Sequence, residues 1–310
     1  MEDKTATVPT VLLTAVAPVV WGSTYAVTQL HLPPDRPLFA AVLRILPAGL
    51  LMMLWLRRLP RGRWWGRAAV LGTLNHAVFF GLLYVAAFRL PSGLAATLTA
   101  LSPLVVMAVA WLAIGERQPR VTFGAALVGI LGVVLLVWQN ERGGAVDPVG
   151  VAAAVGAVVS ASVGFVLVKR WTPPGRVLVT TSWQLVAGGA LLLPVALLAE
   201  GAPPALDLPA VLALTYLGLA GSVVGYAVWF RGLTRMSAGA VAVVGLVNPV
   251  VGTLLGVLLL GEPFGAGHLG AMALVLGSVL LAQAPVRRAA GRLLRPTGGP
   301  VPPTVEPCRP

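Results

Sequence analysis

Long apolar stretches, each bounded by charged residues or by proline and glycine, alternate with short polar loops along most of the chain. A helix that crosses a lipid bilayer needs about 20 mostly apolar residues. By this criterion the sequence predicts ten transmembrane helices, at residues 8–29, 38–56, 68–88, 91–114, 120–138, 148–168, 177–199, 209–230, 237–260 and 266–284. The stretches are apolar on all sides, as expected for helices buried in lipid and protein.

Two parts of this pattern repeat each other. Residues 98–135 and 244–281 align without a gap at a constant offset of 146. Each copy has a proline, Pro103 or Pro249, and a Gly-Glu pair whose glutamate, Glu116 or Glu262, stands 13 positions further on. Both copies predict an apolar helix with a proline near its start, a polar corner and a second apolar helix. The chain is therefore expected to be an internal duplication.

The basic residues predict the orientation of the helices. One set of alternate loops holds 18 of them, and the other set holds only Arg36, Arg89 and Arg142. The 18 are Lys4, Arg57, Arg58, Arg61, Arg63, Arg67, Arg117, Arg120, Lys169, Arg170, Arg176, Arg231, Arg235, Arg287, Arg288, Arg292, Arg295 and Arg309. Because cytoplasmic loops carry the excess of Lys and Arg, both termini are expected in the cytoplasm.

Each half then holds five helices, which is an odd number. The second half must enter the membrane in the direction opposite to the first, and this is the inverted-topology repeat of many secondary transporters. The predicted units are a first repeat at residues 8–138, a second at 148–284 and a disordered cytoplasmic tail at 285–310 that is rich in Pro, Gly and Arg. The expected fold is all-α, with a multi-pass chain in the plasma membrane.

Composition supports this class. Hydrophobic residues make up 57% of the 310 residues and charged residues 10%, against about 25% charged residues in a soluble domain. The net charge of +12 is assigned to loops that face anionic lipid, because no interleaved aromatic residues predict a nucleic-acid surface. The single cysteine, Cys308, excludes an intrachain disulfide and a CxxC metal or redox site.

Together these motifs resemble the drug/metabolite transporter superfamily, in particular its EamA-type branch. The likeness covers about residues 10–284 and lies in WGSTY at 21–25, Arg44 with the small and leucine residues after it, SPLVVMAVAWLAIGER at 102–117, WQLVAGGALLLP at 183–194 and NPVVGTLLGVLLLGE at 248–262. The resemblance implies two inverted five-helix halves around a central cavity that opens alternately to each side. His76 and the long tail depart from the family pattern.

Polar groups inside a bilayer are expensive and usually face a cavity or the interior of the bundle. In the first helix, Trp21, Ser23 and Tyr25 are such candidates, and Trp21 and Tyr25 share one face. They are expected either to line a cavity by stacking or cation–π contact or to serve packing.

Arg44 in the second helix is expected to bind an anionic substrate, to snorkel to the interface or to tie helices together. Gln184 occupies the corresponding place in the seventh helix if WQLVAGG aligns with LRILPAG.

His76, beside Asn75 in the third helix, has two interpretations. A histidine titrates near neutral pH and can carry a coupling proton, but a neutral imidazole that is hydrogen-bonded between helices is the interpretation we favour. Glu116 and Glu262 are interpreted as structural corners, held by backbone N–H groups or an arginine, rather than as proton carriers.

Ser102-Pro103 and Asn248-Pro249 stand at matching places in the two halves. A proline inside a helix removes a hydrogen bond and loosens the helix, which suits either rocking between two states or a simple kink. Ser102 and Asn248 complete the set of candidate cavity residues. The spacing of Gly221 and Gly225, and of Gly252 and Gly256, is interpreted as close helix packing.

The sequence therefore predicts a secondary transporter. The expected substrate is a small organic metabolite such as an amino acid or an aromatic compound, and the expected direction is export across the plasma membrane. The alternatives are a membrane-embedded enzyme or a receptor or scaffold that does not transport. The sequence holds no HExxH, HxxxH, paired carboxylates or Ser/His/Asp set in its helices and no GxxxxGK[ST] loop. No catalytic residue, cofactor or metal is expected. The expected partners are the lipid bilayer and a small-molecule substrate, with a homodimer left open and no nucleic acid.

Overall fold

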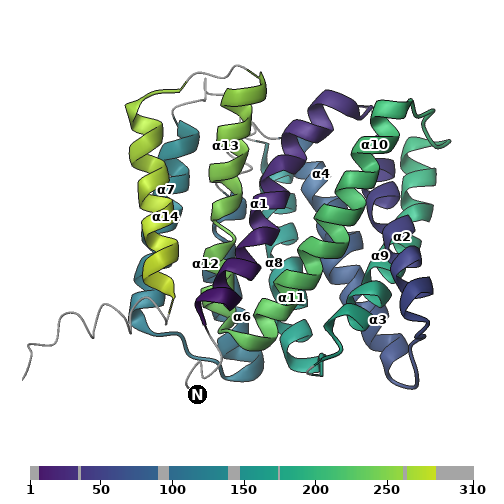
Figure 1. Ribbon diagram of the computed structural model, residues 1–310, viewed down its shortest axis with the longest axis horizontal. Helices are drawn as coiled ribbons and strands as arrows, with labels where there is room; N and C mark the ends of the chain where they lie inside the picture. The colour runs from purple at the N-terminus through teal and green to yellow at the C-terminus, as the bar shows by residue number, and fades with distance from the viewer. Residues whose placement is uncertain are drawn as a thin grey trace, which may run out of the picture.

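The computed structural model describes residues 7–33, 36–89, 98–138, 147–173, 175–260 and 264–283. Every regular element within these ranges is a helix (Figure 1). Glu262 and the predicted tail lie outside the described residues.

The helices of the first half follow the apolar stretches closely. They are α1 (Val8–His31), α2 (Pro37–Leu56), α3 (Trp64–Gly72), η1 (Thr73–Val78), α4 (Phe79–Arg89), α6 (Ser102–Ile114) and α7 (Arg120–Trp138). The segments α3, η1 and α4 form one continuous helix whose middle, η1, is a π-helical turn.

The second half has the same order of elements. They are α8 (Pro148–Trp171), α9 (Val177–Glu200), α10 (Leu208–Tyr216), η2 (Leu217–Val224), α11 (Gly225–Arg235), α12 (Ala238–Val244), α13 (Val247–Leu260) and α14 (Ala266–Ala282). Here α10, η2 and α11 are continuous, and η2 is again π-helical. At the repeat offset of 146, residues 73–78 of η1 correspond to residues 219–224 of η2, so the π-helical turns lie at equivalent places.

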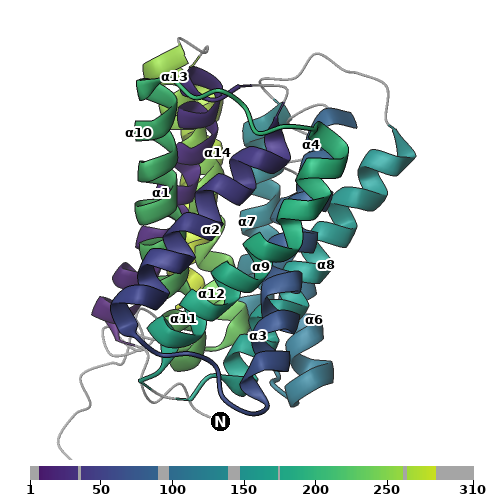
Figure 2. The ribbon, with the colours of Figure 1, turned by 90° about the vertical axis from the view of Figure 1, so that its right-hand side faces the viewer.

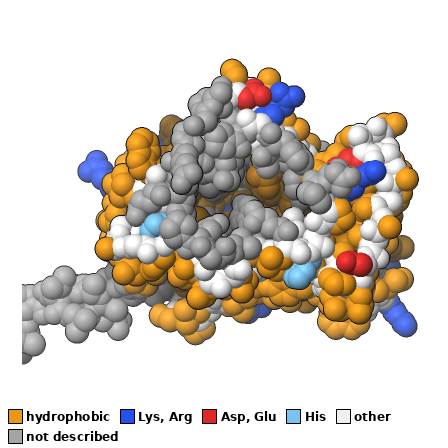
Figure 3. All heavy atoms as spheres, turned by 90° about the horizontal axis from the view of Figure 1, so that it is seen from above, with side chains coloured by type: hydrophobic (Ala, Val, Ile, Leu, Met, Phe, Trp, Pro, Cys, Tyr) orange, Lys and Arg blue, Asp and Glu red, His pale blue; other side chains and the backbone are white. Residues whose placement is uncertain are grey.

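Several helices have the length and composition of membrane spans. Six helices in the described part of the chain are long and apolar enough to cross a bilayer, and three shorter ones are also apolar. Large apolar side chains point outward, among them Leu198, Trp138 and Leu112. Figure 3, which looks onto one end of the bundle, shows hydrophobic side chains around its rim and only scattered charged ones. The prediction of an all-helical membrane protein is confirmed at this level.

Helices from the two halves pack against one another. The α2 helix lies along α9, and α7 lies along α14 (Figures 1 and 2). The α1 helix contacts α13 and α11, while α8, its counterpart in the second half, contacts α6 and α4. In these contacts the roles of the two halves are exchanged.

The fourth and ninth predicted helices are each broken near their middle. Leu101 forms a turn between helical residues 98–100 and α6, and Gly245 and Leu246 form a turn between α12 and α13. At both turns the backbone makes i to i−3 hydrogen bonds, from Leu101 N to Leu98 O at 3.2 Å and from Leu246 N to Val243 O at 3.1 Å. Pro103 and Pro249 therefore lie in the first turn of a new helical segment, where a missing N–H costs little.

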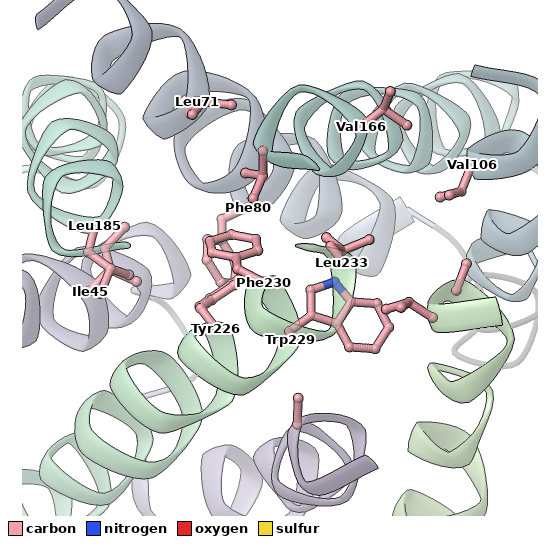
Figure 4. Packing of buried hydrophobic residues seen from close by; sticks show 14 of the residues in the cluster. Ile45, Leu71, Phe80, Val106, Val166, Leu185, Tyr226, Trp229, Phe230 and Leu233 are labelled. Atoms are coloured by element: carbon pink, nitrogen blue, oxygen red, sulfur yellow. The ribbon is translucent and has the colours of Figure 1, made fainter. Parts of the chain in front are cut away.

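The main core lies between the halves. Figure 4 shows Ile45 of α2 facing Leu185 of α9, with Phe80, Tyr226 and Phe230 gathered beside them. These aromatic rings are almost completely buried. They occupy the region in which α2, α4, α9 and α11 approach one another, and this region holds the candidate site.

Candidate functional site

Arg44 lies in α2 with only 7% of its surface exposed. Its Nε donates a hydrogen bond to Ser222 Oγ of η2 at 3.1 Å, and its guanidinium carbon lies 5.6 Å from the centre of the Phe80 ring. Because a charge in hydrocarbon is expensive, a buried arginine needs such polar and cation–π contacts. The side chain points into the bundle, and snorkelling to the interface is not observed.

A second polar link joins the halves on the other side of the core. Asn75 Nδ2 of η1 donates to Gln184 Oε1 of α9 at 3.0 Å, and Gln184 Nε2 donates to Thr180 O at 3.1 Å. Asn75 and Gln184 are both buried. Hydrogen bonds between polar side chains in membrane helices are worth about 0.6–2 kcal/mol each.

These two links occupy corresponding places in the repeat. Arg44 of α2 bonds to the π-helical turn of the second half, and Gln184 of α9 bonds to the π-helical turn of the first. The offset of 146 also pairs His76 with Ser222. Each π-helical turn, a feature frequent at functional sites, thus receives a polar side chain from the opposite half.

Trp21 of α1 also reaches the π-helical turn of the second half. Its Nε1 donates to Gly221 O at 2.8 Å, and its ring lies 5.1 Å from the ring of Tyr226 and 5.3 Å from that of Trp229. The resulting aromatic cluster connects α1 to α11. It has the flat apolar faces on which an aromatic or cationic ligand stacks.

His76 is completely buried and lies against this cluster. Its ring centre is 4.5 Å from that of Tyr226 in an edge-to-face contact. Neither ring nitrogen has a hydrogen-bond partner within the described residues. The interhelical hydrogen bond that we favoured for His76 is made instead by its neighbour Asn75.

Four buried polar atoms around this point lack a partner among the described residues, namely His76 Nδ1 and Nε2, Asn75 Oδ1 and Trp229 Nε1. A buried polar atom without a hydrogen bond costs about 1–3 kcal/mol. Such atoms are rare in native proteins and call for an explanation. A polar ligand or ordered water that enters between the halves would satisfy them.

Gly221 and Gly225 have a different role from the one that their spacing predicts. A Cβ at Gly221 would lie 2.8 Å from Arg44 Nη2, and one at Gly225 would lie 2.8 Å from Trp21 Nε1. The spacing therefore leaves room for two candidate site side chains. Its interpretation as close packing of helix backbones is wrong for this pair.

The remaining predicted cavity residues lie on α1, α6 and α13. The Ser23 and Tyr216 hydroxyls are 2.8 Å apart, and the side chain of Tyr25 lies outside the part that the structure describes. Ser102 and Asn248 are half-buried beside the breaks in their helices. A Cβ at Gly22 would lie 2.8 Å from Asn248 O, which places the WGSTY motif directly against the NPVVG motif.

Glu116 forms a corner that joins three helices. Its Oε2 lies 2.5 Å from Lys169 Nζ at the end of α8, and its Oε1 accepts hydrogen bonds from Ala238 N at 2.7 Å and Gln118 Nε2 at 2.6 Å. The carboxylate thus caps the start of α12, which favours negative charge. The N–H group belongs to a helix of the other half, not to the next helix along the chain, and the cation is a lysine instead of an arginine.

Several residues of the site were not predicted from the sequence. Ser222, Tyr226, Trp229 and Phe80 contact the predicted residues. Serine and aromatic residues are common in apolar helices, so only the repeat offset that pairs Ser222 with His76 gave a signal. Glu200 was also missed, and it caps α2 by accepting from Leu38 N at 2.6 Å and Phe39 N at 2.9 Å.

Within the described ranges no group of three or more His, Cys, Asp or Glu side chains has the arrangement of a metal site. The ionisable groups in the core are instead Arg44, His76 and Tyr226, surrounded by aromatic rings.

Comparison with known families decides the class. The model of the EamA-like transporter family matches this chain twice, over residues 8–138 and 148–283. The chain belongs to the EamA-like transporter family. Its resemblance to the drug/metabolite transporter superfamily is confirmed. Its assignment to the membrane transport proteins is confirmed as well.

Other EamA-like relatives cover most of the chain. Protein PecM of Dickeya dadantii is 37% identical over 86% of this chain and 90% of its own length. The uncharacterized inner membrane transporter YedA of Escherichia coli K12 is 29% identical over 85% of this chain and 87% of its own. A probable amino-acid metabolite efflux pump of Salmonella typhimurium is 26% identical over 85% of this chain and 91% of its own length.

One solved crystal structure shares this EamA-like fold. It superposes with a TM-score of 0.77, covers 91% of this chain and 98% of its own, and has 22% sequence identity. The likeness establishes the arrangement of helices, and the family and relatives establish a multi-pass membrane protein of the transporter class.

Proposed function

We propose that this protein is a secondary transporter that exports a small organic metabolite, such as an amino acid or an aromatic compound, across the plasma membrane by alternating access. The family match and the names of the relatives support a transporter. The substrate class, the direction and the mechanism are inferred from the chemistry of the core.

We propose ten membrane-spanning helices in two inverted repeats, at residues 8–138 and 148–284, with both termini in the cytoplasm. The exchange of roles in the packing supports the inversion, because α1 contacts α13 and α11 while α8 contacts α6 and α4. The matching π-helical turns and the matching breaks before Pro103 and Pro249 support the same repeat. In this proposal the irregular backbone at these points allows one half to rock against the other.

The observation that carries the proposal is the group of buried, unpartnered polar atoms at the junction of the halves. His76 Nδ1 and Nε2, Asn75 Oδ1 and Trp229 Nε1 are buried without a partner among the described residues, and the rings of His76 and Trp229 belong to the aromatic cluster around Trp21 and Tyr226. Binding substrate there would satisfy these atoms and offset the cost of burying them. A stable structural core has no need of them.

In this proposal Arg44 binds a carboxylate or another anionic group, and Trp21 with Tyr226 and Trp229 stacks on the body of the substrate. Gln184 and His76 contribute hydrogen bonds, and Ser23, Tyr25, Ser102 and Asn248 line the passage on either side. The helix breaks at Pro103 and Pro249 serve as gates. The Glu116 and Glu262 corners hold helix ends in place as the halves move.

Flux into proteoliposomes tests the proposal. Purified protein is reconstituted, and movement of radiolabelled amino acids and aromatic metabolites is measured with Arg44→Gln and Trp21→Phe variants. Each removes one polar group of the core, so we expect flux of the transported compound to fall by about tenfold or more. The matched controls Arg231→Gln and Trp138→Phe change exposed residues and are expected to leave flux unchanged.

Two outcomes contradict the proposal. If a compound binds but does not cross the membrane, the protein is a receptor rather than a transporter. If flux is carried equally well by the Arg44 and Trp21 variants and by their controls, the substrate site lies elsewhere in the chain.

A further inference from the structure

A cavity lies at the end of the bundle where α1 begins. It has a volume of about 630 Å³ and lies between the end of α2, the start of α3 and the start of α9 (Figure 1, lower right). Its lining residues are Arg57, Arg58, Leu59, Pro60, Arg61, Trp64, Trp65, Arg176, Val179 and Trp183. The volume is in the range of small-molecule sites, which is about 300–1,000 Å³.

The charges of this cavity are all of one sign. Four arginines, Arg57, Arg58, Arg61 and Arg176, line it, and no acidic side chain does. Among the described residues, no hydrogen bond or ion pair is made by any of these four guanidinium groups. Guanidinium groups bind phosphate through paired N–H donors, so the cavity is arranged for a phosphate-bearing anion.

Tryptophan residues make the other wall. The Trp64 and Trp183 rings are 5.6 Å apart, and Trp183 Nε1 donates to Arg58 O at 2.7 Å. This hydrogen bond fixes the loop between α2 and α3, which holds Arg58 and Arg61, to α9. Trp65 is 60% exposed, and tryptophan with a free apolar face is typical of the boundary between hydrocarbon and lipid headgroups.

The backbone at Arg57 is a further sign that the arginines are placed for a ligand. Arg57 ends α2 with φ of 49°, and it is the one non-glycine residue with positive φ in the described part of the chain. Glycine is the usual residue at this position because it lacks the steric penalty of a Cβ. An arginine at this position adds one more positive charge to the lining of the cavity, and the left-handed backbone conformation there is less favourable for arginine than for glycine.

We propose that this cavity binds the phosphate headgroup of an anionic phospholipid. A soluble phosphate compound would use the arginines alone, but the cavity opens onto apolar surface suited to acyl chains. Leu54, Trp55 and Leu59 are strongly exposed around the end of α2. Basic pockets beside membrane helices bind lipid headgroups by this combination of charge and apolar contact. The proposal does not depend on the substrate or mechanism of transport.

Native mass spectrometry of the full-length protein in detergent tests the proposal. The probes are phosphatidylglycerol, phosphatidylcholine as the zwitterionic lipid and glycerol 3-phosphate as the soluble phosphate. Arg58→Gln, Arg61→Gln and Arg176→Gln are combined in one variant, and Arg57 is left in place to preserve the end of α2. The control combines Arg117→Gln, Arg120→Gln and Arg231→Gln, which also removes three exposed charges.

We expect the parent protein to retain phosphatidylglycerol in preference to phosphatidylcholine and the cavity variant to bind it at least about tenfold more weakly, with the control unchanged. Equal loss in both variants would mean general surface attraction and would overturn the proposal. Binding of glycerol 3-phosphate that displaces the lipid completely would identify a soluble phosphate site and would also overturn it.

The single variant Arg61→Glu keeps the test valid if the combined variant does not fold. Arg61 lies exposed in the loop between α2 and α3, and its side chain makes no hydrogen bond or ion pair with another described residue. Reversal of its charge should weaken phosphatidylglycerol binding while the elution profile and Tm of the protein without lipid stay the same. Unchanged lipid binding in this variant counts against the proposal.

Discussion

Arg44 shows how single residues define the site. A buried guanidinium is costly in a membrane protein, and here it is held by Ser222 and by the ring of Phe80. In the proposed function this guanidinium binds the anionic group of the substrate. Gly221 and Gly225 provide the space that Arg44 and Trp21 occupy. The positions of the polar side chains in the core therefore depend on these two glycines.

We predict that Gly221→Ala impairs transport more than it impairs stability. The added Cβ would lie 2.8 Å from Arg44 Nη2, and the guanidinium is the flexible end of a side chain, so it will move instead of unfolding the helix. A displacement of about 1 Å in a binding group costs on the order of a hundredfold in rate when binding geometry is demanding. Flux in proteoliposomes and Tm in detergent measure the two effects.

Gly270→Ala is the control for this prediction. A Cβ at Gly270 meets nothing within 4 Å, and alanine favours the helix, so flux and Tm are expected to stay the same or rise slightly. Parent-like flux in the Gly221 variant would show that Arg44 has no part in substrate binding.

Individual residues were only partly predictable from the sequence. Arg44, Asn75, His76 and Gln184 stand out because a polar residue within an apolar stretch is rare and conspicuous. Their partners do not stand out, because Ser222 is 178 positions away from Arg44 and serine is unremarkable in a membrane helix. Which two helices touch is decided by packing, and no local pattern encodes it.

At the level of elements, the two halves interrupt their helices at the same places. The π-helical turns η1 and η2 and the breaks before Pro103 and Pro249 are irregular backbone in the interior of the bundle. Irregular backbone at membrane depth is tolerated where protein or a water-filled passage surrounds it. The apolar pattern predicted where helices lie, but it contained no signal for the π-helical turns.

Close crossing of α3 and α9 leads to a stability prediction. A Cβ at Gly72 would lie 2.7 Å from Gly188 N and 2.8 Å from Gln184 O. Backbone atoms cannot move aside, so Gly72→Ala is expected to destabilise the protein by about 1–3 kcal/mol and to lower Tm in detergent. Gly66→Ala on the same helix meets nothing within 4 Å and should raise Tm or leave it unchanged. An equal Tm for the two variants would contradict the crossing.

Removal of the Glu116 carboxylate should loosen the junction of α6, α8 and α12. Glu116→Ala removes both the contact with Lys169 and the cap on Ala238 N, and loss of a cap alone costs about 0.5–2 kcal/mol. Glu116→Gln keeps an oxygen for the cap and is expected to lower Tm less. In the Lys169→Met background the effect of Glu116→Ala should shrink, because the pair is already broken. Fully additive Tm changes would show that the two side chains do not interact.

The whole molecule is organised by contacts between its halves. The α2 helix lies on α9, α7 lies on α14, and α1 and α8 make equivalent contacts with the opposite half. In the proposed mechanism the halves rock at this junction and open it alternately to each side, which is the geometry that inverted repeats provide. The cavity lined by arginine and tryptophan lies at one end of this junction, where the end of α2 and the start of α3 meet the start of α9.

Labelling of cysteines tests the orientation of the whole chain. Cys308 is the single native cysteine, and we expect a membrane-impermeant maleimide to label it in inverted vesicles but not in intact cells. Ala202, exposed between α9 and α10, should behave in the opposite way as Ala202→Cys in a Cys308→Ser background. Labelling of Cys308 in intact cells would place the C-terminus outside and contradict the proposed cytoplasmic termini.

The sequence by itself determined the class of this protein, the approximate position of its helices, the repeat and the rare polar residues of its core. These follow from hydrophobicity and spacing, which act locally along the chain. The tertiary structure decided which polar groups meet, which are left without partners among the described residues, and where the loop between α2 and α3 contacts α9. Those features arise from packing between segments more than a hundred residues apart, where the shape of one helix surface must fit another.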